Sequence, residues 1–391
     1  MATDGPAPDL DLIDWGAVED APRLARRDRA FVGTFVAFLA GATAYTVGGG
    51  PSSPVFGFWD PLLVDWMFYA ALLVFGVYVV WPLARPGSLL RRSWSSLRAD
   101  RAALASFGWL AVFVLVGTAE PLIVRSIPFN PLNQPPAGFA IYTGYVGSCV
   151  GEVTGELCHG TLAHPFGTDG NGRDLLLLTV AGMRTALEMT LITAVIIVPI
   201  GVGVGTVAGY VGGRVDDGLM RYVDAQQTLP ALFIYIALAV VYGPSLTLMV
   251  VVFGLLYWGD IARLVRSEVL QVTQAEFVDA ARMAGVSQWQ VIRHHVIPNA
   301  APTVLSITAL KLPLLVIIEA TLSYLEFADP RVVSWGNVVS VNVLWSQDPT
   351  LYWWVSLFPI GALVLTTLAI SLFGNALQDA IDPRHLGGGH G

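Results

Sequence analysis

The chain has 391 residues, of which 54% are hydrophobic and 13% are charged, and its formal net charge is −8. Soluble domains carry about 25% charged residues, so this composition excludes an ordinary soluble domain. The acidic balance also excludes a broad basic face of the kind that binds nucleic acid.

Apolar residues gather in runs close to the roughly 20 residues that a bilayer-spanning helix needs. The first run begins near Ala30 and follows an acidic segment, so residues 1–29 are predicted to be a retained cytoplasmic tail and not a cleaved signal peptide. The pattern predicts an all-α polytopic membrane protein with about eight transmembrane helices. These spans are expected at 31–49, 61–83, 104–124, 177–210, 229–243, 246–260, 302–324 and 354–376.

The predicted loop at 128–176 carries the only two cysteines of the chain, Cys149 and Cys158. A disulfide between them is expected if the loop lies outside the cytoplasm. Two free thiols are the alternative, and the spacing of the pair with His159 is not that of a zinc site. No metal site is therefore expected.

Charged side chains within spans are costly and usually have a defined role. Arg184 and Glu188 are four residues apart on the fourth predicted span, while Lys311 and Glu319 lie close to one face of the seventh. In one interpretation these residues line a pathway or brace an interface with a second subunit. In the other, which we prefer, they pair with each other inside the protein or snorkel toward its surface.

Arginine accumulates on alternate sides of the predicted spans, and basic loops are retained in the cytoplasm. With the N-terminus inside, every inner segment holds at least as many arginines as its outer neighbours, so both ends of the chain are predicted to be cytoplasmic. The inner arginines are Arg23, Arg26, Arg27, Arg29, Arg85, Arg91, Arg92, Arg98, Arg101, Arg214, Arg221, Arg263, Arg266, Arg282, Arg293 and Arg384. The outer ones are Arg125, Arg173 and Arg331.

A polar segment at 273–299, which contains the sequence DAARMAGVSQWQVIRHHVIPN at 279–299, lies between two predicted spans. A helix is predicted up to Gly285, which tolerates the left-handed conformation of a helix stop, and Pro298 stands where the next helix begins. Ala280 and Ala281 leave a small-residue face that another surface can approach closely. The segment is therefore expected to form a short helix, parallel to the membrane, that fits a groove on a partner.

This segment resembles the EAA loop of bacterial and archaeal ABC importer permeases. In that loop Glu-Ala-Ala is followed by three residues, a glycine, nine residues and an apolar end that closes in proline. Asp279 stands here in place of the glutamate, and the other positions match. The resemblance implies that the segment docks on an ATPase through Glu276, Asp279, Ala280, Ala281, Gly285, His295 and Pro298.

A second motif, HPFGTDGNGRD at 164–174, resembles the segment before the transport core in the C-type permeases of dipeptide and oligopeptide importers. Its glycines permit a tight loop, and its aspartates can cap a helix or pair with the arginine. The residues that carry this motif are Gly167, Thr168, Asp169, Gly172, Arg173 and Asp174.

The resemblance covers roughly residues 162–386, so 177–386 is expected to be a permease core and 30–127 to hold extra N-terminal helices. The sequence departs from the family in having three spans before the second motif, where one is usual. It also places Glu326 where a small residue is common.

The resemblance implies one half of a heterodimeric translocation pathway for di- or oligopeptides in a prokaryotic cell membrane. The expected partners are a second homologous permease, two ATPase subunits, an extracytoplasmic substrate-binding protein and the lipid bilayer, with no nucleic acid. The sequence contains no P-loop of the form GxxxxGK[ST], so no cofactor is expected on this chain. ATP and magnesium are expected on the ATPase subunits, and the chain itself is not expected to be an enzyme.

Two other classes of protein fit the sequence less well. An ion-coupled secondary transporter is the alternative, but the sequence shows no internal repeat of the kind that marks many such proteins. An intramembrane enzyme is the third class, and no GxSxG, HExxH or paired-aspartate motif within a span supports it.

Overall fold

The computed structural model describes residues 26–48, 61–81, 100–124, 127, 131–273, 292, 297–345 and 350–381. The chain divides into two compact units, Met1–Ser53 and Pro54–Gly391. The first unit contains helix α2, Arg26–Gly48.

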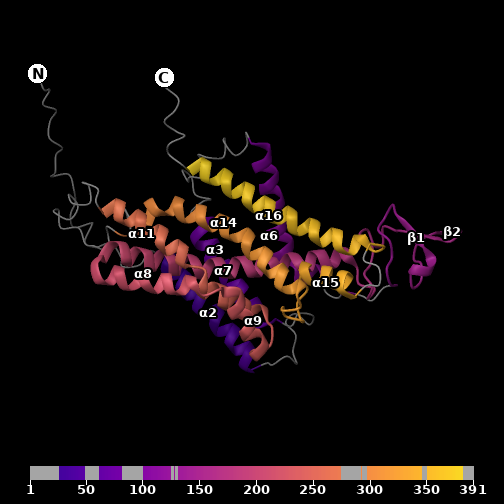
Figure 1. The fold of residues 1–391 in the computed structure, drawn as a ribbon, viewed down its shortest axis with the longest axis horizontal. Coiled ribbons are helices and arrows are strands. Elements are labelled where there is room, and N and C mark those ends of the chain that lie inside the picture. Colours follow the sequence, from indigo (N-terminus) through magenta and orange to yellow (C-terminus); the bar gives the residue numbers. More distant parts are fainter. Residues whose placement is uncertain are drawn as a thin grey trace, which may run out of the picture. The chain divides into compact units, whose positions relative to one another are not determined.

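The second unit is built almost entirely of helices, which confirms the all-α class (Figure 1). Its helices are α3 (Leu63–Phe75), the π-helical η3 (Gly76–Val80), α6 (Arg101–Ile123), α7 (Leu175–Val211), α8 (Gly213–Thr228), α9 (Ala231–Tyr242), α10 (Leu246–Leu256), α11 (Gly259–Thr273), α14 (Ile297–Tyr324), α15 (Trp335–Trp345) and α16 (Trp353–Ile381). Between α6 and α7 lie the strands β1 (Ala140–Tyr142), β2 (Val153–Thr154) and β3 (Leu157–His159) and the 3-10 turn η4 (Thr143–Tyr145).

Six helical segments within the described residues are long and apolar enough to cross a bilayer. A seventh results if α8 and α9, which meet at an angle of 67°, are counted as one broken span, and α2 has a shorter apolar stretch, Phe31–Tyr45. The part of the chain that the structure describes thus holds six or seven spans where eight were expected. The six are Leu63–Val80, Arg101–Ile123, Leu175–Val211, Leu246–Thr273, Thr303–Tyr324 and Trp353–Gln378.

Two expected spans are missing from these six: the first, for which α2 supplies only the shorter apolar stretch, and the fifth. The sixth is present with other bounds than expected. The fifth corresponds to α9, which has only 12 residues and reaches spanning length only together with α8. The sixth was expected to end at Asp260, but α10 and α11 together run on to Thr273. Arg263 and Arg266, which were expected in the segment after this span, lie within α11, where they form ion pairs with Asp224 and Asp216 of α8.

Helix α7 is 37 residues long and is the central helix of the second unit, where it packs against α3, α6, α8, α10, α11, α14, α15 and α16 (Figure 1). On its second half Gly201, Gly205 and Gly209 recur every four residues and face α11. A Cβ atom at Gly209 would lie 2.8 Å from the Cβ of Val269, and one at Gly205 would overlap the carbonyl oxygen of Ala262. These glycines therefore allow α11 to lie unusually close to α7.

The end of α14 is closed by a Schellman motif. Glu326 has a φ of 64°, in the left-handed region. The amide of Phe327 donates to the carbonyl of Leu322 at 2.8 Å, and the amide of Glu326 donates to the carbonyl of Ser323 at 3.2 Å. These two bonds satisfy carbonyl groups that the end of the helix would otherwise leave open.

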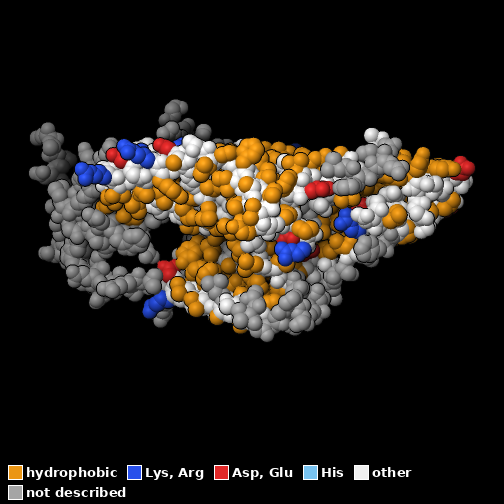
Figure 2. Space-filling view, turned by 60° about the horizontal axis from the view of Figure 1, so that its bottom comes forward, with side chains coloured by type: hydrophobic (Ala, Val, Ile, Leu, Met, Phe, Trp, Pro, Cys, Tyr) orange, Lys and Arg blue, Asp and Glu red, His pale blue; other side chains and the backbone are white. Residues whose placement is uncertain are grey.

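Figure 2 shows a face on which hydrophobic side chains cover a broad area and charged side chains are few. Among the exposed hydrophobic residues, Val240, Val241 and Tyr242 at the end of α9 are 72%, 73% and 77% exposed. Soluble monomers rarely expose apolar patches of such extent, so this surface fits the hydrocarbon of a bilayer.

Candidate functional site

The predicted coupling residues fall mostly outside the described part of the chain. These residues are Glu276, Asp279, Ala280, Ala281, Gly285 and His295. The backbone of Pro298 is described and lies in the first turn of α14. N–H groups in the first turn have no acceptor within the helix, so proline loses no helical hydrogen bond there. The structure therefore describes the two helices that flank the segment, α11 and α14, which pack against each other.

Lys311 and Glu319 share a helix but do not form a common site. The ammonium of Lys311 donates to Oδ2 of Asp260 on α11 at 2.6 Å. Glu319 is 1% exposed, and its carboxyl oxygen accepts a hydrogen bond of 2.7 Å from the hydroxyl of Ser323. Each of these charged residues therefore has a partner inside the protein.

Arg184 lies at the centre of a buried charge cluster in which three carboxyl groups surround one guanidinium. Its Nη2 lies 2.5 Å from Asp65 of α3, and its Nε lies 2.7 Å from Glu188 and 3.9 Å from Glu120 of α6. The contact with Glu188 is an ion pair by distance, although the direction of the N–H leaves Oε1 of Glu188 without a hydrogen bond. The ring of Phe68 lies 5.1 Å from the guanidinium carbon. The predicted pairing of Arg184 with Glu188 is therefore part of a larger cluster that includes the N-terminal helices.

Asp65 and Glu120 were not among the residues that the sequence singled out. Both are acidic side chains within predicted apolar spans, and such residues usually mark a defined partner. That signal was available, but it could not name Arg184 as the partner, because the partner lies far away along the chain.

The second motif forms the loop that enters α7. The carboxylate of Asp174 caps this helix by accepting from the amides of Leu176 at 2.9 Å and Leu177 at 3.2 Å. Its other oxygen lies 2.7 Å from Nδ1 of His164. Asp174 therefore fixes both the start of α7 and the direction from which the chain enters it.

Asp169 and Arg173 close the same loop from within. Nε of Arg173 donates to Asp169 at 2.8 Å, and the backbone amide of Arg173 donates to the same carboxylate at 2.7 Å. Gly167 and Gly172 have φ values of 79° and 76°, which glycine adopts without the strain that a side chain would bring. The expected roles of the aspartates and of these two glycines thus agree with the geometry of the loop.

The loop is also attached to the start of α16. Thr168 is fully buried, and its carbonyl accepts a hydrogen bond of 3.1 Å from the indole of Trp354. Its hydroxyl accepts from the amide of Gln134 at 2.8 Å. The rings of Phe166 and Phe358 stack with their centroids 4.1 Å apart. These contacts hold the beginnings of α7 and α16 together.

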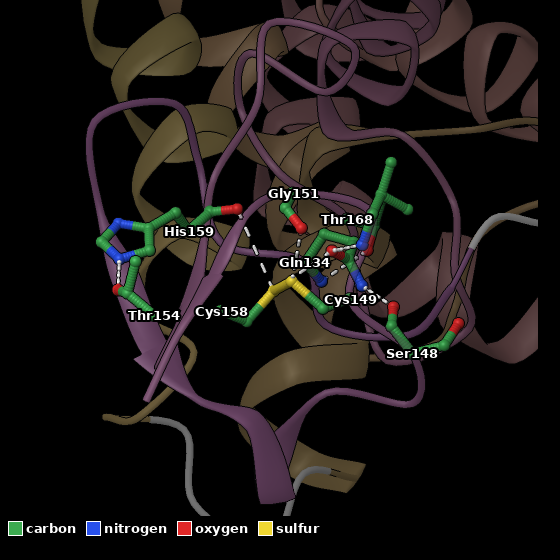
Figure 3. Close-up of a disulfide and its surroundings, with 9 residues drawn as sticks. Gln134, Ser148, Cys149, Gly151, Thr154, Cys158, His159 and Thr168 are labelled. Carbon is green, nitrogen blue, oxygen red and sulfur yellow. Dashed lines mark hydrogen bonds between the residues drawn. A yellow bond between two sulfur atoms is a disulfide. The ribbon is translucent and has the colours of Figure 1, made fainter. Parts of the chain in front are cut away.

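Cys149 and Cys158 form a disulfide, with their Cα atoms 5.7 Å apart (Figure 3). Cys158 belongs to β3, which pairs in antiparallel fashion with β1 on one side and β2 on the other. The buried side chain of Gln134 lies beside the disulfide, donates to the carbonyl of Ser148 and accepts from the amide of Val150 at 3.1 Å. The small sheet, the disulfide and Gln134 therefore form one ordered element between α6 and α7, beyond one end of the helices in Figure 1.

Electrostatics favour an ionised carboxylate in the loop after α14. Burial of Asp329 by itself opposes ionisation, but Arg331 donates to its two oxygens at 2.9 and 2.7 Å. The hydrogen bonds and the charge of Arg331 outweigh burial and hold the pKa of Asp329 below its ordinary value. This ion pair fixes the turn between α14 and α15 close to Trp335, whose indole donates to the carbonyl of Thr179 at 2.9 Å.

The sequence was compared with those of known proteins. Residues 201–386 match the family described as "Binding-protein-dependent transport system inner membrane component". The oligopeptide transport system permease protein OppC of Haemophilus influenzae is 35% identical over 222 residues, which are 56% of this chain and 70% of that protein. The dipeptide transport system permease protein DppC of Bacillus subtilis is 35% identical over 225 residues, or 56% of this chain and 69% of that protein.

OppC of Escherichia coli K12 is also similar, with 34% identity over 222 residues that make up 72% of its length. Residues 201–386 contain the last part of α7, the helices α11 and α14 that flank the polar segment, and the helix α16. The chain therefore belongs to the family of inner membrane components of binding-protein-dependent transport systems, in the group that includes the C-type oligopeptide and dipeptide permeases.

Proposed function

We propose that this chain forms one half of the translocation pathway of an ATP-driven importer of di- or oligopeptides. The peptide substrate class is supported by the names of the relatives, which are oligopeptide and dipeptide permeases. The other half of the pathway is a second homologous permease, and an extracytoplasmic binding protein delivers the substrate. The ion-coupled alternative has no comparable support, because the matched family depends on a binding protein.

We further propose that segment 273–299 receives force from an ATPase subunit. The observation that carries this proposal is the EAA-like pattern of the segment, held between two helices that pack against each other, α11 and α14. Closure of two ATP-bound ATPase subunits would displace the segment, and the attached helices would follow as a rigid-body shift. ATP and magnesium belong to the ATPase subunits in this proposal.

The same proposal places both chain ends and segment 273–299 in the cytoplasm, and the disulfide in the loop outside it. It is supported by the distribution of arginine and by the disulfide itself, because disulfides persist in oxidising compartments. The membrane is a prokaryotic cell membrane.

The coupling role is tested by co-purification of the ATPase subunits with the assembled transporter. Ala281→Arg and Gly285→Pro should leave the chain inserted but release the ATPase subunits. A disrupted interface anchor costs about 2 kcal/mol or more, so their affinity should fall by about 30-fold or more. Ala281→Ser is the matched control, because serine keeps the side chain small and neutral. Unchanged co-purification and peptide uptake in Ala281→Arg would show that the segment is not the ATPase contact.

A further inference from the structure

Helices α8 and α11 are joined side by side by three polar contacts. From one contact to the next, the residue numbers increase along α8 and decrease along α11, so the two helices run antiparallel. The three contacts are Asp216 with Arg266 at 2.5 Å, Asp224 with Arg263 at 2.6 Å and Gln227 with Asp260 at 2.6 Å. Together they are the α8–α11 seam.

Asp260 extends this seam to a third helix. One of its oxygens accepts from Gln227 of α8, and the other accepts from Lys311 of α14 at 2.6 Å. Lys311 is the only lysine in the chain, and its side chain is 13% exposed. Its ammonium also lies 5.6 Å from the ring of Tyr257. A buried ammonium needs a counter-charge, so Asp260 holds α14 against α11 as well as α11 against α8.

A second link joins α11 and α14 closer to segment 273–299. The hydroxyl of Thr303 donates to Glu268 at 3.2 Å. The two helices that flank the segment are therefore connected to each other at two levels, and α8 is connected to both of them through Asp260.

The helix path is interrupted close to Asp260 at two junctions, between α8 and α9 and between α10 and α11. The bend of 67° between α8 and α9 falls at Leu229 and Pro230, two or three residues after Gln227. The break between α10 and α11 falls at Tyr257 and Trp258, just before Asp260.

The two long helices carry prolines at the same level. α14 carries Pro313 two residues after Lys311. α7 carries Pro199 two residues before Gly201, where a Cβ atom would meet Ile261 at 2.7 Å. Proline inside a helix removes a backbone hydrogen bond and permits a kink. The two helix junctions and the two prolines define a hinge level, with Asp260 directly beside it.

We propose that α8, α11, the part of α7 that follows Pro199 and the part of α14 from 297 to 311 move as one rigid unit about this hinge level, and that Asp260 is the positioning residue that joins α8, α11 and α14. The inference rests on the proposed coupling through segment 273–299. A force on that segment acts on α11 and α14 together. The rigid unit transmits this force to α9 at the bend between α8 and α9. Without Asp260, α14 would lose its charged link to α11, and α8 would be held to α11 only through Asp216 and Asp224.

The first experiment uses the assembled transporter in liposomes and measures peptide transported per ATP hydrolysed. Asp260→Asn and Lys311→Met should each lower this ratio about tenfold, within the range of coupling losses along a contact network, while the ATPase subunits remain bound. Exchange of the two charges, Asp260→Lys with Lys311→Asp, should restore a large part of the ratio, as a purely local packing role would not. A wild-type ratio in both single variants would overturn the proposal.

The second experiment does not depend on the stability of those variants. Asp224 and Arg263 are 63% and 46% exposed in their side chains, so cysteines at both positions can be bridged by a flexible bifunctional reagent. Cys149 and Cys158 are already joined and do not react. Because α8 and α11 do not slide past each other in a rigid unit, the bridged protein should transport like the two single-cysteine variants treated with the same reagent. Loss of transport in the bridged protein alone would overturn the proposal.

Failure of the inference is distinguishable from failure of the proposed function. If segment 273–299 does not contact an ATPase, Ala281→Arg leaves co-purification unchanged. If only the rigid unit is wrong, Ala281→Arg releases the ATPase subunits while Asp260→Asn keeps a wild-type transport ratio.

Discussion

At the scale of single residues, Glu326 occupies a backbone position that suits glycine. Its φ of 64° ends α14, and a side chain with a Cβ atom is strained in that region. The family pattern has a small residue at this point, and the Schellman motif explains why. Glutamate is tolerated because the amide bonds of the motif hold the conformation in place.

Replacing Glu326 with glycine should therefore stabilise the protein. Relief of left-handed strain is worth about 1 kcal/mol or more, and the greater freedom of glycine in the unfolded chain offsets part of it. We expect a net gain of about 0.5–1 kcal/mol, measured by thermal unfolding in detergent. Glu326→Ala is the control, because alanine keeps the Cβ atom and should give a smaller gain or none. Equal gains from alanine and glycine would mean that the backbone strain is not the cause.

A second residue-scale prediction concerns Asp65, which connects an N-terminal helix to the central helix. Asp65→Ala removes the 2.5 Å contact to Arg184 and also the cap at the start of α3, where the carboxylate accepts from the amide of Leu62. Because Glu188 and Glu120 still face Arg184, the free energy of unfolding should fall by about 1–3 kcal/mol, which is less than the cost of a fully uncompensated charge.

The measurement for Asp65→Ala is the midpoint of thermal unfolding of the purified protein. Glu156→Ala, at an exposed acidic residue in the loop between α6 and α7, is the matched control and should leave the midpoint unchanged. If both variants unfold like the wild type, the charge cluster does not hold α3 in place.

At the scale of elements, the close packing of α11 on α7 depends on glycine at three positions. Gly205→Leu would drive a side chain into the backbone of α11, and overpacking of this kind costs about 1–3 kcal/mol. Gly203→Leu is the matched control, because Gly203 is exposed and a Cβ atom there meets nothing within 4 Å. We expect Gly205→Leu to lower the yield of folded protein in size-exclusion chromatography and Gly203→Leu to leave it unchanged. The same yield for both would contradict the assigned contact.

The sequence predicted elements whose signals are local. The loop at 164–174 is an example, because Asp174 caps a helix that starts at the next residue and Asp169 pairs with Arg173 four positions on. Pro298 at the start of α14 is another. In each case the signal lies within about one helical turn of the feature that it predicts, so the spacing of residues in the sequence is enough to predict that feature.

The sequence could not predict the elements that depend on distant partners. The sixth span was expected to end at Asp260, whereas the helical path continues past it and Lys311, 51 residues away, neutralises its carboxylate. The partner of Arg184 on α3 lies 119 residues away. Arg184 lies beside Glu188, as the preferred interpretation has it, but Lys311 pairs with Asp260 and not with Glu319. The pairing of Arg184 with α3 follows only from the packing of helices.

At the scale of the whole molecule, the second unit has different structural elements at its two ends. In Figure 1, β1 and β2 lie beyond one end of the helices, and α8 and α11 reach toward the other. Leu162, in the loop that leads to α7, is 85% exposed, and Tyr222 of α8 is 60% exposed. In the proposed orientation these two positions lie on opposite sides of the membrane.

The proposed orientation predicts which side each position faces. In intact cells, a membrane-impermeant thiol reagent should label Leu162→Cys and should not label Tyr222→Cys. After the cells are opened, both should be labelled. The native cysteines remain unreactive because they are bonded to each other. Labelling of Tyr222→Cys in intact cells would reverse the orientation and remove segment 273–299 from the reach of a cytoplasmic ATPase.

The contact between Asp65 and Arg184 also has a consequence for biogenesis. Asp65 precedes Arg184 by 119 residues, so a ribosome that adds about 5–20 residues per second synthesises the carboxylate roughly 6–24 s before the guanidinium. When α7 leaves the insertion machinery, the acidic ends of α3 and α6 are already available to receive its positive charge. The N-terminal helices thus lower the cost of admitting a charged central helix to the lipid phase, and synthesis without them should leave α7 slow to insert.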